Sequence, residues 1–81
     1  MKITADERLF WFLKRGSELD LNKTSDLELF MQQVLSRGRT EDVKYLLKIV
    51  EPVRFEPAFR TIEHFLPSQV RSFWNDFLAN H

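Results

Sequence analysis

The stretch from Val34 to Val50, VLSRGRTEDVKYLLKIV, decides the fold that the sequence predicts. Gly38 stands at the expected end of one helix, where a residue that tolerates positive φ is preferred. Thr40 is a favourable N-cap for a second helix, and Glu41 and Asp42 place negative charge on its first turn. The apolar residues behind this cap recur at helical spacing, at Val43, Leu46, Leu47 and Val50. The stretch therefore predicts two helices joined by a turn at one glycine.

Both flanks of this stretch predict further helices. A capping box at Thr4–Glu7 predicts a helix from about Ala5 to Arg15, which ends at Gly16. The polar connector that follows, about residues 17–24, is expected to be a loop because a lone strand would have no partner. A second capping box at Ser25–Glu28 opens the helix that ends before Gly38. The remaining expected helices run from about Glu41 to Val50, from Pro57 to about Phe65 after a break at Glu51, and from Ser68 onward.

These elements predict an all-α fold for residues 1–81, a single compact bundle of four to five short helices around a central helix–Gly turn–helix hairpin. Four of the segments carry an apolar face at helical spacing, and none alternates over enough residues to indicate a sheet. One shared core is expected to contain Phe30, Val34, Leu46, Leu47, Phe59, Ile62, Phe73 and Phe77.

The composition favours a small, water-soluble domain with a neutral surface. Twelve basic residues balance twelve acidic ones, so no long-range attraction to nucleic acid or to an anionic membrane is expected. The chain has no cysteine, which excludes disulfides and thiolate sites and agrees with a cytoplasmic location. It also has no apolar run long enough to span a bilayer and no signal peptide.

A run of aromatic residues marks the first candidate for a functional surface. Phe10, Trp11 and Phe12 are consecutive, and Leu9 and Leu13 flank them. Five successive apolar residues point in every direction around a helix, whereas a surface helix normally shows one apolar stripe. Either this segment is wrapped by the other helices, or Phe10, Trp11 and Phe12 contact another protein. The expected partner is a second protein or another copy of the chain.

No group of residues predicts a reaction centre. Of the two histidines, His81 ends the chain and His64 has no second histidine or carboxylate pair at ligand spacing. The sequence has no glycine-rich phosphate loop and no serine in a nucleophile elbow. We therefore expect neither enzymatic activity nor a metal, a cofactor or a small-molecule substrate.

An alternative prediction is a DNA-binding helix–turn–helix domain. Arg37, Arg39 and Lys44 form the nearest approach to a basic patch. However, Glu41 and Asp42 stand at the start of the helix that would read DNA, and the phosphate backbone would repel them. The charge pattern favours a solvated protein surface over a nucleic-acid interface.

The chain resembles a family of small helical bacterial proteins without assigned chemistry. The similarity lies in an early Phe-Trp pair, in Phe73-Trp74, and in an R-G-x-x-E-D-[IV]-K-x-L-L core that matches Arg37 to Leu47. Relatives often have an aspartate after the first tryptophan, where this chain has Phe12. Members are frequently encoded beside a nucleotidyltransferase-type toxin. The resemblance implies an antitoxin-like or accessory role, and so a non-enzymatic protein-interaction domain.

Overall fold

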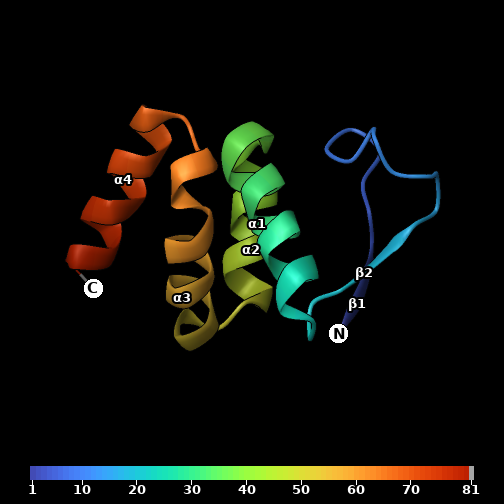
Figure 1. Ribbon diagram of the computed structural model, residues 1–81, viewed down its shortest axis with the longest axis horizontal. Coiled ribbons are helices and arrows are strands. Elements are labelled where there is room, and N and C mark those ends of the chain that lie inside the picture. Colours follow the sequence, from blue (N-terminus) through green and yellow to red (C-terminus); the bar gives the residue numbers. More distant parts are fainter. Residues whose placement is uncertain (81) are drawn as a thin grey trace.

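The computed structural model describes residues 1–80, which form a row of helices with a small sheet at one end (Figure 1). The helices account for 62% of the chain, so the fold is mostly helical but is not the purely α-helical bundle that the sequence predicts. In chain order the elements are β1 (Lys2–Thr4), β2 (Glu18–Asp20), α1 (Thr24–Arg37), α2 (Thr40–Ile49), α3 (Pro52–Ile62), the short 3-10 helix η1 (Glu63–Phe65) and α4 (Ser68–Ala79).

The N-terminal segment contradicts the prediction of a first helix from Ala5 to Arg15. β1 and β2 pair as antiparallel strands with Ile3 opposite Leu19, and the residues between them form turns. The carbonyl of Asp6 accepts from the N–H groups of Leu9 and Phe10, so the backbone closes one turn and does not continue. Gly16 then reverses the chain with φ at +82°, a conformation that glycine adopts at little cost. The predicted loop over residues 17–24 is wrong at Glu18–Asp20, because β2 does have a partner.

The start of α1 does not use the predicted capping box. The helix begins at Thr24, and no side chain caps it. The carboxylate of Asp26 instead accepts a hydrogen bond of 2.9 Å from the backbone N–H of Asp20. This bond joins the end of β2 to the first turn of α1, so the acid that acts here makes a contact between elements.

The start of α2 is capped by a different residue from the one predicted. The helix includes Thr40, and Arg39 occupies the N-cap position. Asp42 accepts a hydrogen bond of 2.8 Å from the backbone N–H of Arg39, which satisfies a donor that would otherwise be unpaired. The helix and its length are close to the prediction, but the cap comes from the acid inside the first turn.

Gly38 joins α1 and α2 without adopting positive φ. Its φ is −73°, so the prediction of a left-handed C-cap is wrong. A Cβ atom at this position would collide with the carbonyl oxygen of Val34 and would lie 3.1 Å from Cβ of Asp42. Glycine is required here because the end of α1 and the start of α2 approach each other closely.

Helix α3 begins earlier than the sequence predicts. The break at Glu51 is confirmed, but Pro52 occupies the first helical turn and Pro57 lies inside the helix. An interior proline removes the hydrogen bond to the carbonyl four residues earlier, here that of Val53. Val53, Glu56 and Pro57 are all exposed, so this side of α3 faces water and the interruption is tolerated.

One hydrophobic core joins the N-terminal segment to all four α-helices. It contains the predicted residues Phe30, Val34, Leu46, Phe59 and Ile62. Two other predictions are wrong, since Leu47 is 43% exposed and Phe73 is 60% exposed. Phe77 is partly buried and packs against the core. The N-terminal segment supplies buried residues that were not in the predicted set, namely Ala5, Leu9, Phe10, Leu19 and Leu21.

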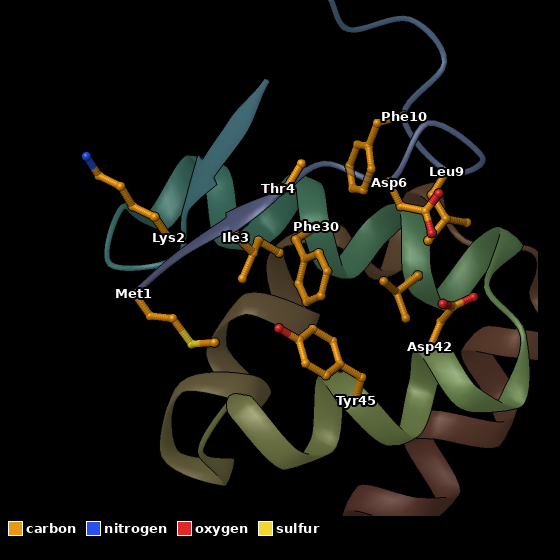
Figure 2. Close-up of a pocket in the computed structure, with 11 residues that line it drawn as sticks. Met1, Lys2, Ile3, Thr4, Asp6, Leu9, Phe10, Phe30, Asp42 and Tyr45 are labelled. Atoms are coloured by element: carbon orange, nitrogen blue, oxygen red, sulfur yellow. The ribbon is translucent and has the colours of Figure 1, made fainter. Parts of the chain in front are cut away.

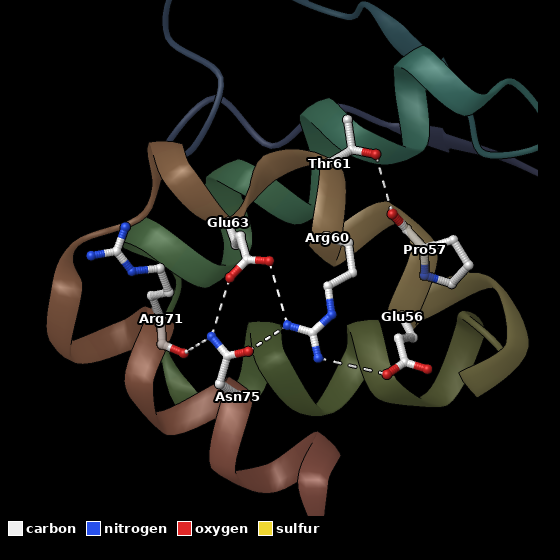
Figure 3. Close-up of polar contacts among 7 residues, drawn as sticks. All are labelled: Glu56, Pro57, Arg60, Thr61, Glu63, Arg71 and Asn75. Atoms are coloured by element: carbon white, nitrogen blue, oxygen red, sulfur yellow. Dashed lines mark hydrogen bonds and ion pairs between the residues drawn. The ribbon is translucent and has the colours of Figure 1, made fainter.

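Helix α4 lies at the end of the row, and a polar network attaches it to α3 and η1 (Figure 3). The side-chain amide of Asn75 donates to Glu63 at 3.2 Å and to the carbonyl of Arg71 at 2.9 Å, and its oxygen accepts from Arg60. Arg60 also pairs with Glu56 and Glu63. In addition, the ring of Trp74, which is the only fully buried side chain of α4 in the described chain, packs 5.4 Å from Phe55.

Candidate functional site

Two aromatic side chains stand out of the loop between β1 and β2. Trp11 is 59% exposed and Phe12 is 51% exposed. Their rings meet edge to face with centroids 5.4 Å apart, a favourable geometry for aromatic pairs. The guanidinium of Arg37, at the end of α1, lies 4.8 Å from the centre of the Trp11 ring. We call these three residues the Trp11 surface.

The loop that carries this surface is attached to the core at several points. Phe10 is buried beside Phe12, with ring centroids 6.2 Å apart. The side-chain amide of Gln33 donates a 2.6 Å hydrogen bond to the carbonyl of Leu9. Gln33 is itself buried within α1. A buried glutamine that holds a loop carbonyl orders the residues next to it, so Trp11 and Phe12 are presented by an anchored loop.

The structure divides the aromatic run that the sequence identified. Phe10 belongs to the core, whereas Trp11 and Phe12 point away from it. The expectation that part of this apolar run contacts another protein therefore rests on two of its side chains, Trp11 and Phe12. A contact with another protein remains a prediction for these two residues.

The three basic residues of the alternative DNA-binding prediction do not share one groove. Arg37 lies over Trp11. Arg39 and Lys44 instead line a groove between α2 and α4, beside the apolar residues Val43 and Phe73. Both acids of the first turn are present, with Glu41 exposed and Asp42 hydrogen bonded to Arg8 and Arg39. DNA binding stays a prediction.

A cavity of about 310 Å³ lies between the N-terminal segment, α1 and α2. Figure 2 shows Ile3, Phe10 and Phe30 pointing into it, with Asp42 and Tyr45 reaching it from α2. Nothing in the sequence pattern indicated this cavity, because its lining comes from β1, a turn and two helices. Only the pairing of β1 with β2 brings these residues together.

The two carboxylates beside this cavity, those of Asp6 and Asp42, both contact Arg8 in the N-terminal turn. Arg8 contacts Asp42 at 2.7 Å and Asp6 at 3.5 Å. Burial, the largest single influence, raises the pKa of Asp42, but the hydrogen bonds from Arg39 and Arg8 and the positive charges of these two residues together outweigh it, and the pKa lies below its usual value. Asp42 therefore links α2 to the N-terminal turn and is charged at neutral pH, whereas the contact of Asp6 with Arg8 is local.

The histidine that the sequence analysis considered lies on the surface. The ring of His64, in η1, packs against Phe65 with centroids 4.0 Å apart. Over residues 1–80, no three histidine, aspartate or glutamate side chains are grouped so that they could hold a metal ion. His81 lies outside the described residues.

The helices of the described chain are too short or too polar to cross a bilayer. No known family model, curated protein or solved structure matches the sequence.

Proposed function

We propose that this chain is a non-enzymatic protein-interaction domain that binds another protein through Trp11 and Phe12. One observation carries the proposal. Two adjoining aromatic rings, each more than half exposed, stand on a loop that Gln33 and Phe10 fix to the core. Exposed aromatic patches on small proteins usually mark a contact site, since burying them in water-excluding pockets contributes strongly to binding.

The composition of the Trp11 surface suits a partner with an apolar pocket and an acidic rim. Tryptophan and arginine are the residues most often found at the energetic centre of interfaces. Among residues 1–80 no carboxylate forms an ion pair with Arg37, whose guanidinium is held over Trp11. A partner could therefore bury the indole ring and supply an acid to Arg37. The anchored loop reduces the ordering cost of such a contact.

The resemblance described above suggests the class of partner, a nucleotidyltransferase-type toxin, and so an antitoxin-like or accessory role in the bacterial cytoplasm. In this chain, residues of the shared core motif have structural roles. Gly38 permits the close approach of α1 and α2, Asp42 caps α2, and Leu46 is fully buried. We therefore assign partner binding to the Trp11 surface and not to the motif.

The test is a calorimetric titration of the purified chain with a nucleotidyltransferase-type toxin. We expect Trp11→Ala and Phe12→Ala each to weaken binding by about 2 kcal/mol, or roughly 30-fold, as central aromatic anchors do. The melting temperature should stay within a few degrees, because both side chains project from the core. Val53→Ala, which truncates a 72% exposed apolar side chain on α3, is the matched control. Unchanged affinity in both loop variants would refute the proposal.

A further inference from the structure

Residues of helices α2 and α4 line an apolar groove, together with residues of α1 and α3. Its first stretch, of about 430 Å³, is lined by the starts of both helices, including Val43 and Phe73. Its second, of about 340 Å³, is lined by their ends, including Leu47 and Phe77. Leu47 follows Val43, and Phe77 follows Phe73, by one helical turn. The two stretches therefore follow one another along both helices, and we call them together the α2–α4 groove.

The groove has a projecting aromatic ring on one wall. Phe73 is 60% exposed, and its ring meets the buried Trp74 edge to face at 5.2 Å. Trp74 in turn contacts Phe77 at 5.2 Å. On the opposite wall Leu47 is 43% exposed. The exposed Phe73 ring is thus the outer end of a row of aromatic contacts that leads into the core, and the groove beside it is large enough to receive a second ring.

Charge is distributed unevenly along the groove. Arg39 and Lys44 line the stretch at the start of α4, whereas Glu56 lines the stretch at its end. Asp76 is exposed on α4, one turn beyond Phe73. Within residues 1–80 neither Lys44 nor Asp76 takes part in an ion pair. Because Glu56 is paired with Arg60, the lining of the groove offers unpaired positive charge at one end, while Asp76, on α4 outside the lining, offers an unpaired negative charge.

We propose that the α2–α4 groove is closed by a second copy of this chain, with the two α4 helices antiparallel across a two-fold axis near Phe73. Helix α4 carries both the projecting ring of Phe73 and the carboxylate of Asp76. The groove provides the space for a ring and the positive charge of Lys44. The surface is thus complementary to itself, which a two-fold interface requires.

The charges select the antiparallel arrangement. With Phe73 at the axis, Asp76 of the second copy lies about 4.5 Å along the helix from that ring, since each residue rises 1.5 Å. It then faces the stretch that Arg39 and Lys44 line, and the contact occurs twice. Parallel α4 helices would instead place Asp76 beside Asp76 and Lys44 beside Lys44, which repel.

Exchanging the charges of Lys44 and Asp76 tests directly whether a second copy of the chain occupies the groove. We expect the wild type to form dimers in sedimentation equilibrium, and Lys44→Asp and Asp76→Lys each to weaken self-association about tenfold or more, since each variant brings like charges together twice. An equimolar mixture of the two variants should associate again, because every contact then joins opposite charges. Lys48→Asp, on the same helix but outside the groove lining, is the matched control and should associate like the wild type.

An aromatic pair of variants tests the centre of the interface. Phe73→Ala should weaken dimerisation by about 30-fold, as loss of a central anchor does, with little change in the melting temperature. Phe65→Ala removes a ring of nearly equal exposure, 61%, that does not line the groove, and should leave the dimer intact. A monomeric wild type at about 100 µM, or a mixture of charge variants that stays monomeric, would overturn the inference. Phe12 lies outside the α2–α4 groove, so the effect of Phe12→Ala on partner binding can be measured independently of dimerisation.

Discussion

The two positions at which the chain has glycine require it for different reasons. Substituting each glycine in turn tests whether the structure gives the right reason. At Gly38 the φ of −73° is open to any residue, but an added Cβ meets the Val34 carbonyl that accepts the Gly38 N–H at 2.8 Å. At Gly16 the φ of +82° is unfavourable for other residues, but an added Cβ has no atom within 4 Å. The first position is limited by space and the second by the backbone dihedral.

For Gly38→Ala we expect a loss of about 2–3 kcal/mol. Opening the bond to Val34 costs about 1 kcal/mol, and moving α1 away from α2 adds about 1–2 kcal/mol as overpacking usually does. For Gly16→Ala we expect about 1–2 kcal/mol from the dihedral alone. The asparagine variants separate the two causes. Asn tolerates positive φ, so Gly16→Asn should recover part of the loss, whereas Gly38→Asn should be no better than Gly38→Ala.

The assay is urea unfolding of the four variants and the wild type, with melting temperatures alongside. In a domain of this length, 2 kcal/mol corresponds to a shift of about 8–16 °C. The reasoning is refuted if Gly38→Ala is within about 0.5 kcal/mol of the wild type, the range of an ordinary surface substitution. It is also refuted if asparagine recovers stability at Gly38 to the same extent as at Gly16.

Two further predictions follow from burial and charge. Leu46→Ala should cost about 2–5 kcal/mol in urea unfolding because this side chain is fully buried. Leu47→Ala should cost less than about 1 kcal/mol because Leu47 is 43% exposed, and equal losses would contradict the assigned faces of α2. The lowered pKa of Asp42 gives a stability contribution that is complete above the ordinary aspartate pKa of about 3.9 and is lost as the pH falls through the folded-state pKa. Asp42→Asn should therefore be less stable than the wild type at pH 7, and the gap should narrow below pH 4; a constant gap would show that its charge is not linked to folding.

The helical part of the fold could be predicted because its signals are local. The apolar faces of α1 and α2, the break at Glu51 and the restart at Ser68 depend on residues within a few positions of one another. The N-terminal segment could not be predicted in the same way. β1 pairs with a strand 16 residues away, and three-residue strands are too short to show an alternating pattern. The capping box at Thr4–Glu7 favours a helix here, and the aromatic run, in which every residue is apolar, has no periodicity that distinguishes a helix from a turn.

The candidate surfaces depend on which apolar residues are covered by another element, and the sequence pattern does not show this. Val70, Phe73, Trp74, Phe77 and Leu78 form a regular helical face on α4. Because α4 stands at the end of the row, the body of the protein covers that face only in part, and Phe73 is left outside (Figure 1). Periodicity predicts an apolar face but not the width of the contact against it. Phe73 was therefore placed in the core, and the α2–α4 groove was missed.

The arrangement of the two proposed surfaces has a consequence for assembly. The loop that carries Trp11 follows β1 at one end of the row, and α4 lies at the other end (Figure 1). Closing the α2–α4 groove with a second copy leaves the N-terminal loops of both chains on the outside of the dimer. Neither Trp11 nor Phe12 lines that groove, so self-association and partner binding do not compete for the same side chains. Such a dimer would offer two Trp11 surfaces, and a bivalent partner would be held more tightly than by one site because its second contact becomes intramolecular.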